Sequence, residues 1–395
     1  MKKVLDGVRI LDLSYFIAGP YCAMLLASMG AEVIRIEPPG GSIDRDVGPY
    51  SPSGKGMYPW HYSCNKKGIT LNTRKEKGKE ILKDLIKNSD IMVQSYLPKA
   101  KKAIGLEYSE LEKTNKGFIL VSFSGYGQNG PYSSRGGFDA IAQGMSGMMS
   151  ITGMPDSIPL KSGSAVIDYG TSLYGVIGAL LALRCREKTG LGQEVDVCLL
   201  DTAVSFMETV FAEYAVLDSE RSQIGNRRPY TAPTDMFKAK DGYVNISVST
   251  DTIWKRFAEL IGKSELIDNP EFKSNRIRYK NHEALADMAQ KWISQKNVSE
   301  VIEVLNAVGV PAGPVYRISE VFDDPQIKAR KIIEYLDYPG EGEIPVPGIA
   351  IKLSKTPVTI DRRAPEVGEH NYDVYGAILK YTDEEISELI KAGVV

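Results

Sequence analysis

Alternating apolar and polar positions divide the first part of the chain into short strands and amphipathic helices. Apolar runs at 8–13 and 31–37 predict two strands, and the Gly19-Pro20 pair between them opens a helix that extends to Ser28. A strand–helix–strand unit of this length is typical of parallel sheet. The pattern therefore predicts an α/β domain at this end of the chain.

The same alternation continues to about residue 199. Residues 78–87 place apolar side chains on one helical face and lysines on the other. Further strands are expected at 90–93, 118–123 and 195–199. Helices rich in Gly, Ala and Ser are expected at 138–149 and 170–184. Asp201 is expected to cap the helix that follows the last of these strands.

A second pattern begins after about residue 220. A strand with one exposed face is predicted at 243–248, and helical patterns follow at 253–262, 283–296 and 299–308. We interpret 225–320 as a smaller α+β domain. The stretch 339–347, rich in Gly, Pro and Glu, is expected to be a loop, and a last helix at 383–392 is expected to pack on the first domain.

Composition and charge narrow the classes of function. The net charge is −2 and the sequence pI is near 6.1, so the chain has no basic field for nucleic acid. The four cysteines contain no CxxC pair, and none of the three histidines has a ligand-like partner one helical turn away, so no metal site is expected. Neither a signal peptide nor an apolar run of membrane length is found. We expect a cytoplasmic protein without nucleic-acid or membrane partners.

One carboxylate in the segment 161–170 is a candidate catalytic group. Asp168 is expected at the end of an apolar, strand-like segment, where α/β proteins face their ligands. With no G-x-S-x-G motif and no metal cluster, Asp168 is a candidate covalent nucleophile. A thioester suits such a nucleophile because its thiolate leaves readily. Backbone amides in the loop 125–130 and at Tyr169-Gly170 are expected to stabilise the oxyanion.

Several sequence blocks occur in order along nearly the whole chain. They lie at 11–13, 18–21, 26–40, 65–71, 124–131, 140–147, 188–193 and 368–370. Together these blocks resemble CoA-transferase family III, the group of formyl-CoA:oxalate and carnitine CoA-transferases. The resemblance implies transfer of CoA from an acyl-CoA to a free carboxylic acid, through an aspartyl anhydride and an aspartyl-CoA thioester on Asp168. Coenzyme A is then a substrate, and no permanently bound cofactor is implied.

The resemblance also implies a fold and a set of CoA contacts. The fold is a Rossmann-like large domain from 1–220 and 321–395, with the smaller domain at 225–320. Two such chains would interlock like chain links in a homodimer, which would explain the helices of small residues. The family's CoA-contacting positions fall on Ile17, Ala18, Leu71, Arg74, Ser95, Tyr96, Leu97, Gly137, Phe138 and Asp139. Arg74 offers a charge for the CoA phosphates, and Tyr96 and Leu97 would flank adenine.

The chain also departs from the family pattern. Many members carry a phosphate-binding arginine where this chain has Ala103, and the adjacent Lys101 and Lys102 are candidates to replace it. Position 17 is Ile rather than the Gln of formyl-CoA transferases, and no glycine tetrad occurs at 225–265. Oxalate specificity is therefore not implied.

Two other functions stay open. An α-methylacyl-CoA racemase of the same fold uses a histidine in a Gly-His-Asp element. The corresponding stretch here contains Phe138, which cannot move a proton. The second alternative is a CoA-binding protein without catalysis, which only an activity measurement excludes.

Overall fold

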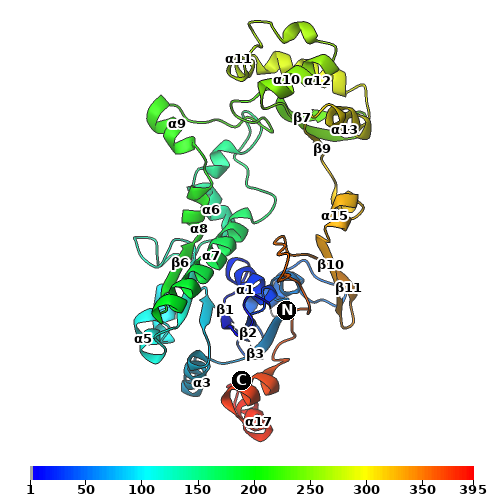
Figure 1. Cartoon of the computed structure of the whole chain (residues 1–395). Coiled ribbons are helices and arrows are strands. Elements are labelled where there is room, and N and C mark those ends of the chain that lie inside the picture. The colour runs from blue at the N-terminus through cyan, green and yellow to red at the C-terminus, as the bar shows by residue number, and fades with distance from the viewer. Residues whose placement is uncertain (1–2) are drawn as a thin grey trace. The chain divides into compact units, whose positions relative to one another are not determined.

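The computed structural model describes residues 3–395 and divides into two compact units (Figure 1). The large unit comprises the chain up to Met148, Lys161–Ala212 and Gln326–Val395. The small unit comprises Met149–Leu160 and Glu213–Pro325. Three stretches that we assigned to the large domain thus lie in the small unit: 149–160 and 213–220 of its first part, and 321–325 of its return segment.

A six-stranded parallel sheet forms the centre of the large unit, which confirms the α/β fold. Its strands are β1 (Arg9–Leu13), β2 (Glu32–Glu37), β3 (Lys66–Thr70), β4 (Ile91–Gln94), β5 (Ile119–Ser124) and β6 (Glu194–Cys198). They run in the order β3-β2-β1-β4-β5-β6, and every neighbouring pair is parallel. The order reverses between β1 and β4. Ligands of such sheets bind outside the carboxyl ends of the strands at that point.

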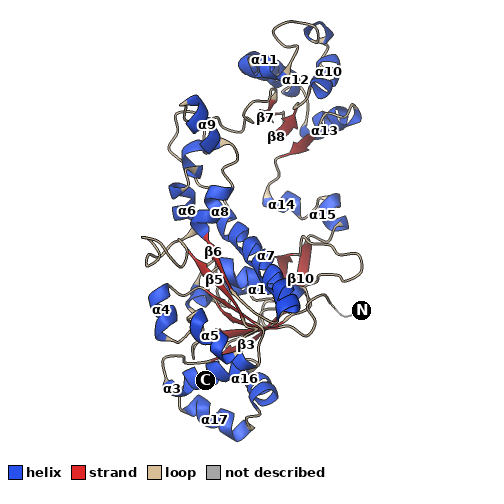
Figure 2. Cartoon of the chain, turned by 60° about the vertical axis from the view of Figure 1, so that its left-hand side comes forward, coloured by secondary structure: helices blue, strands red, loops and turns tan. Residues whose placement is uncertain are grey.

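Helices cover both faces of this sheet (Figure 2). On one face, α1 (Ala18–Ser28) and α7 (Val166–Thr189) pack their apolar side chains against those of β1, β4 and β5. The other face is covered by α3 (Glu76–Lys87), α5 (Tyr108–Thr114), α16 (Asn371–Val374) and α17 (Asp383–Lys391). Buried Ile386 of α17 belongs to this second core, so the last helix packs on the first domain as expected.

The large unit also contains four shorter α-helices, the 3-10 turn η1 (Ile43–Asp46), the π-helical turn η4 (Tyr375–Leu379) and a hairpin. The helices are α2 (Tyr58–Tyr62), α4 (Pro98–Ala103), α6 (Asp139–Met145) and α8 (Leu199–Ser205). The hairpin pairs β10 (Ile333–Tyr338) with β11 (Gly342–Pro347). The prediction of a loop at 339–347 was therefore wrong. β11 pairs with β10 alone, and an edge strand tolerates the prolines that suggested a loop.

The cap of α8 also differs from the expectation. Cys198 is the N-cap residue, and its Sγ accepts a hydrogen bond from the backbone N–H of Asp201 at 3.4 Å. Asp201 therefore lies in the first turn of the helix rather than at the cap. A carboxylate is still favourable there, because it faces the positive end of the helix dipole.

Helix α7 passes close to its neighbours. A Cβ atom at Gly175 would lie 2.3 Å from the ring of Phe123, and one at Gly178 would lie 2.4 Å from Val195. These glycines therefore serve packing within one chain, whereas we expected an interlocked dimer to account for them. By length and composition α7 could also cross a bilayer, contrary to the sequence expectation. Half of its most apolar stretch is buried in the protein, as in a core helix.

The small unit contains a three-stranded antiparallel sheet and helices, an α+β arrangement. Its strands are β7 (Thr234–Lys238), β8 (Tyr243–Ser247) and β9 (Ala312–Pro314), in that order across the sheet. Its helices are α10 (Asp251–Leu260), α11 (Asn275–Lys280), α12 (His282–Ile293), α13 (Val298–Ala307) and α14 (Ile318–Val321). Two further helices, α9 (Val210–Leu217) and α15 (Pro325–Ala329), lie where the chain passes between the units. Buried Phe237, Trp254 and Leu305 belong to a separate core, so this unit has its own apolar interior.

Candidate active site

Two adjacent cavities lie at the carboxyl ends of β1 and β4. We call the first, of about 260 Å³, the Asp168 cavity. It is lined by Tyr15–Gly19, Ser95, Leu97, Phe123–Gly125, Gly136–Phe138, Asp168 and Leu199. We call the second, of about 680 Å³, the Arg74 cavity. It is lined by Leu13, Tyr15, Ile36–Pro39, Ser42, Ile43, Leu71–Arg74, Tyr96, Ala100, Ala103 and Ile104. Tyr15 lines both cavities, so the two are neighbours.

The structure places nearly all the predicted CoA contacts on the walls of these cavities. Ile17, Ala18, Ser95, Leu97, Gly137 and Phe138 line the Asp168 cavity. Leu71, Arg74 and Tyr96 line the Arg74 cavity. Of the predicted set, Asp139 alone lies on neither wall. Residues far apart in the sequence thus meet where the strand order reverses.

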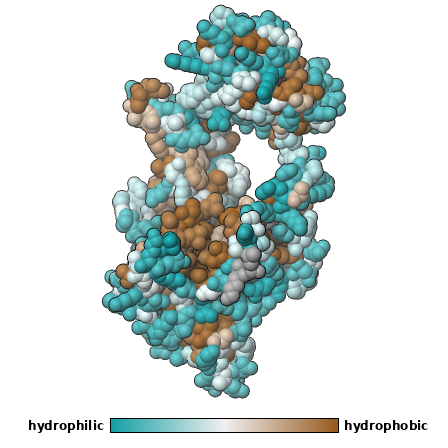
Figure 3. Space-filling model, in the orientation of Figure 1, coloured by the Kyte–Doolittle hydropathy of each residue, from teal (hydrophilic) through white to brown (hydrophobic). Residues whose placement is uncertain are grey.

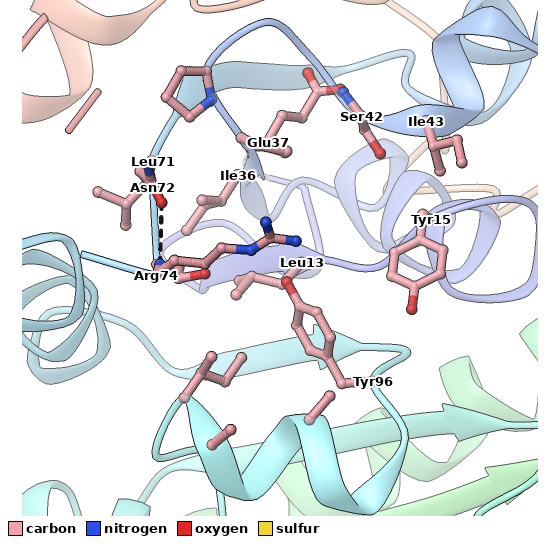
Figure 4. A pocket seen from close by; sticks show the side chains of 16 residues that line it. Leu13, Tyr15, Ile36, Glu37, Ser42, Ile43, Leu71, Asn72, Arg74 and Tyr96 are labelled. Atoms are coloured by element: carbon pink, nitrogen blue, oxygen red, sulfur yellow. Dashed lines mark hydrogen bonds between the residues drawn. The ribbon is translucent and has the colours of Figure 1, made fainter. Parts of the chain in front are cut away.

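Arg74 is the cation of the larger cavity. Figure 4 shows its side chain extending across the cavity between Leu71 and Tyr96. Its backbone N–H donates to Oδ1 of Asn72 at 3.1 Å. Within residues 3–395 its guanidinium has no ion-pair partner, so the charge is available to an anionic ligand.

Asp168 lies in the first turn of α7, and the expectation that it ends a strand was wrong. The polar stretch 161–165 forms no strand, and the helix begins at Val166. The helix dipole by itself favours an ionised carboxylate at this position, but burial outweighs it, because the net shift of the Asp168 pKa is upward. Asp168 therefore reaches the cavity from a helix, while the strand ends supply the residues around it.

Asp139 holds the beginning of this helix. Its Oδ2 accepts hydrogen bonds from the backbone N–H groups of Ile167, at 2.7 Å, and of Asp168, at 3.3 Å. Its Oδ1 accepts from the side chain of Gln143, whose Oε1 in turn accepts from the backbone N–H of Ser162 at 2.9 Å. These bonds use N–H groups that the first turn of a helix otherwise leaves unpaired.

The expected oxyanion donors need a correction. The backbone N–H of Tyr169 donates to the carbonyl of Ala165 at 3.1 Å, and Gly170 lies inside α7. These residues form no turn and offer no free donor. In the loop 125–130, Gly125 does line the Asp168 cavity, beside Gly136 and Gly137.

Gly125 and Gly137 approach each other closely at the wall of the Asp168 cavity. A Cβ atom added at Gly137 would lie 2.7 Å from the Cα of Gly125, a distance that real side chains avoid. Both positions therefore require glycine, and the cavity wall at this point is bare backbone. A ligand can approach the peptide groups directly there.

The carboxyl of Asp168 is partly buried and lies in an apolar setting. Burial, and to a lesser extent the nearby carboxylate of Asp139, raises its pKa to about 7. Among residues 3–395, no hydrogen bond to its carboxylate oxygens stabilises the charge. A poorly solvated carboxylate of this kind is a stronger base and nucleophile than an exposed one.

The sequence did not lead us to Tyr15 and Phe16 as residues of the site. Phe16 has a φ of 65°, and its backbone N–H donates to Oδ2 of Asp44 at 3.2 Å. Asp44 is buried and is held by Nη2 of buried Arg35 at 2.8 Å. The ring of Phe16 meets that of Phe138 edge to face, with 5.5 Å between the centroids. The sequence could have indicated them, because both lie within three residues of the carboxyl end of β1, where ligands of such sheets bind.

A cluster of aromatic residues beside Asp168 was also missed. The Tyr62 and Tyr169 hydroxyls lie 3.1 Å apart, and the rings of Tyr21 and Tyr169 pack edge to face. Burial raises the pKa of Tyr58, and the charge of Asp168 raises it further. Burial lowers the pKa of His61 to about 4, so this histidine is neutral at physiological pH. The composition of 58–62, Tyr-Pro-Trp-His-Tyr, was the available signal.

The two lysines proposed to replace a missing arginine differ in their surroundings. Lys101 is buried, forms an ion pair with Glu194 and hydrogen-bonds Gln128 at 3.3 Å. Its charge is therefore already satisfied away from both cavities. Lys102 is exposed, and its nearest carboxylate oxygen, on Glu107, lies 3.9 Å away. Among the described residues, no cluster of His, Cys, Asp and Glu is arranged to hold a metal ion.

Comparison with known proteins shows which family this chain belongs to. A model of the family described as CoA-transferase family III matches residues 5–371. The chain belongs to CoA-transferase family III. Succinyl-CoA--D-citramalate CoA-transferase of Chloroflexus aurantiacus is 34% identical over 389 residues, covering 98% of this chain and 97% of that protein. Human succinyl-CoA:glutarate CoA-transferase is 34% identical over 394 residues, covering 100% of this chain and 90% of that protein.

Solved structures agree with the family assignment. A CAIB/BAIF family protein from Brucella suis superposes with a TM-score of 0.84 at 31% identity, covering 96% of this chain and 100% of that one. In sequence, formyl-CoA:oxalate CoA-transferase of Streptomyces avermitilis is also similar, at 34% identity over 412 residues, covering 100% of this chain and 100% of that protein. This family III protein is accordingly a transferase that moves CoA.

Proposed function

We propose that this family III enzyme transfers CoA from an acyl-CoA to a free carboxylic acid through covalent intermediates on Asp168. One observation carries the proposal. Asp168 is the carboxylate on the wall of the Asp168 cavity, in the midst of the residues that the family resemblance assigns to CoA. Its pKa, raised to about 7, marks a poorly solvated carboxylate suited to attack on a thioester.

The reaction proceeds in two balanced halves. The Asp168 carboxylate attacks the thioester carbonyl, forming a mixed anhydride and releasing CoA thiolate. The thiolate then attacks the aspartyl carbonyl, giving an aspartyl-CoA thioester and freeing the donor acid. The acceptor carboxylate attacks this thioester to form a second anhydride. The released thiolate attacks the acceptor's acyl carbonyl, which yields the new acyl-CoA and restores Asp168.

CoA itself would extend from the Asp168 cavity into the Arg74 cavity past Tyr15. The thioester end meets Asp168, with Ile17, Ala18, Gly137 and Phe138 around it. The adenosine end lies against Tyr96 and Leu71, and Arg74 offers its charge to phosphate. CoA enters and leaves as a substrate, so no permanently bound cofactor is required.

The names of the relatives indicate which acyl groups to test first. The named relatives act with succinyl-CoA on citramalate or glutarate, or with formyl-CoA on oxalate. These acids form a first panel for this chain. Ile17 and Phe138 make the wall near Asp168 apolar, so less polar acids belong in the panel as well.

We also infer a homodimer, supported by an apolar face of α7. Leu173, Ile177 and Leu181 follow one another at helical spacing and are 48%, 52% and 63% exposed. Figure 3 shows apolar surface gathered over this part of the large unit. An exposed apolar stripe of this kind favours association. An interlocked pair should stay dimeric in light scattering on dilution to nanomolar concentration, whereas a monomer at all concentrations would disprove it.

We also propose that the protein is located in the cytoplasm, a reducing compartment. The four cysteines are free, and three of them are buried. Such cysteines are typical of proteins that need no disulfide. The location stays a prediction, which fractionation of cells expressing the tagged protein would test.

The decisive experiment is a transfer assay. A panel of acyl-CoAs is mixed with pooled carboxylic acids, and new acyl-CoA species are identified by mass spectrometry. We expect products with the wild-type enzyme and none with Asp168→Ala. Transfer that survives this substitution would exclude the covalent mechanism. Deuterium exchange at the α-carbon of a 2-methylacyl-CoA, without transfer, would instead support the racemase.

A further inference from the structure

A group of paired charges, most of them buried, lies beside the segment 14–20, which connects β1 to the first turn of α1. The group forms three ion pairs, so it is neutral as a whole. The pairs are Asp12–Lys66, Arg35–Asp44 and Glu37–Arg45. The ammonium of Lys66 and the carboxylate of Asp12 are fully buried and lie 2.7 Å apart.

We propose that the Asp12–Lys66 pair positions the segment 14–20 for CoA transfer. This segment supplies Tyr15–Gly19 to the wall of the Asp168 cavity. Neither Asp12 nor Lys66 lies on a wall of the Asp168 or Arg74 cavity, so the two act through the backbone that they hold. The inference rests on the proposed function only in taking the Asp168 cavity as the place where the thioester reacts.

The pair holds the segment at both of its ends. Oδ1 of Asp12 accepts a hydrogen bond from the hydroxyl of Ser14 and another, at 3.0 Å, from the backbone N–H of Ser14. Nζ of Lys66 donates to the carbonyl oxygen of Pro20 at 2.8 Å. Because Lys66 also contacts Asp12, one ion pair joins the beginning of the segment to its end.

The middle of the segment has a conformation that needs support from outside. Phe16 has a φ of 65°, which is unfavourable for a residue with a large side chain. Its backbone N–H is held by Asp44, which is held in turn by Arg35. Burial opposes the ionisation of Asp12, but the charges of Lys66 and Arg35 outweigh burial and hold the pKa of this carboxyl below its ordinary value. Asp12 therefore remains a charged acceptor for the segment.

Stability alone does not account for a fully buried ion pair. Replacing such a pair by apolar residues of similar size is often neutral or stabilising, because the charges no longer have to leave water on folding. Here the pair selects one path for the segment, and that path is narrow: a Cβ atom at Gly19 would lie 2.4 Å from the Cβ of Ser14. A displaced segment would move Ile17 and Ala18 on the cavity wall, and a misplacement of about 1 Å can slow a reaction about 100-fold.

The experiment replaces the pair in the double variant Asp12→Leu/Lys66→Met, which leaves no unpaired buried charge. Amide hydrogen exchange, read by mass spectrometry, should become about tenfold faster or more in the peptide covering 14–20 and stay unchanged in β5 and β6. The kcat for transfer should fall about tenfold or more, because the thioester is misplaced. The calorimetric dissociation constant and stoichiometry for CoA should change less than about twofold, because the Arg74 cavity is untouched. A variant that is merely less folded would bind CoA with reduced stoichiometry and exchange faster throughout, which would overturn the proposal.

Arg9→Met/Glu32→Leu is the matched control. This pair joins the amino ends of β1 and β2, with Nε of Arg9 2.7 Å from Oε2 of Glu32, and should leave both exchange in the segment and kcat unchanged. An equal fall of kcat in the control, or wild-type exchange and kcat in the double variant, would overturn the proposal.

A milder variant covers the case in which the first does not fold. Asp12→Asn/Lys66→Met keeps an acceptor for Ser14 and loses the bond to Pro20, and its exchange and kcat are judged by the same criteria. Hydrogen exchange needs no turnover, so a failure of Asp168 as the nucleophile is distinguished from a failure of this inference.

Discussion

The carboxylate of Asp139 binds the backbone of Asp168, the residue whose side chain lines the site. Its Oδ2 accepts from the N–H groups of Ile167 at 2.7 Å and of Asp168 at 3.3 Å. One acidic side chain thus fixes the start of α7 and also places a negative charge near Asp168. The first effect positions the nucleophile, and the second makes it more basic.

Replacing Asp139 by Asn should lower the apparent pKa of Asp168. The amide oxygen still accepts the N–H bonds, but the charge that helps to raise the pKa is gone. The acid limb of the pH–rate profile should therefore move to lower pH. Asp139→Ala removes the bonds as well, and we expect it to lower the free energy of unfolding by about 1–2 kcal/mol. A profile unchanged in Asp139→Asn would exclude the electrostatic role.

The wild-type rate should depend on the ionisation of Asp168. Only the carboxylate attacks a thioester, and burial holds its pKa at about 7. Below that pH, kcat/KM should fall about tenfold per pH unit as the carboxyl is protonated, and above it the rate should level off. Initial rates from pH 5 to 9 in buffers of constant ionic strength check this. A profile that is flat down to pH 5 would show that the group is already ionised there.

The contact between Gly137 and Gly125 predicts a strong effect of one methyl group. A Cβ atom at Gly137 would lie 2.7 Å from the Cα of Gly125, so Gly137→Ala must push two backbone segments apart. We expect the free energy of unfolding to fall by about 1–3 kcal/mol. Gly136→Ala is the control, because a Cβ atom there meets nothing within 4 Å. Chemical denaturation compares the two, and equal stabilities would contradict the steric argument.

The sheet was largely predictable from sequence, because buried parallel strands are continuous apolar runs. β3 is the exception. It begins with Lys66, whose ammonium is fully buried and contacts Oδ2 of Asp12 at 2.7 Å. A lysine in a strand usually indicates exposure. Its partner lies 54 positions earlier, so the pattern around it could not reveal the pairing.

The sequence predicted which residues form the site better than it predicted how these residues are arranged in space. The family resemblance identified the cavity walls at 17–18, 71–74, 95–97 and 137–138, which the structure brings together. The start of α7 was misplaced because its stabilising carboxylate comes from Asp139, far upstream, rather than from a local cap.

Asp168→Asn should abolish transfer and yet stabilise the protein. The folded-state pKa of about 7 lies above the ordinary value of 3.8, so the folded protein resists ionising this group. The protonated form is fully favourable below about pH 4, and this contribution is lost as the pH rises towards 7. At pH 8 the carboxylate is therefore destabilising. An amide is neutral at every pH and avoids this cost, so Asn should raise the free energy of unfolding by about 1–2 kcal/mol.

The pH dependence of that difference separates electrostatics from packing. Urea denaturation at pH 5 and pH 8 should show a larger gain for Asp168→Asn at pH 8, because wild-type Asp168 is mostly protonated at pH 5. The exposed residue Asp46 provides the control, and Asp46→Asn should change little at either pH. A gain for Asp168→Asn that is equal at both pH values would mean that shape, rather than the buried charge, sets the stability of this site. The raised pKa would then no longer explain why Asp168 is reactive.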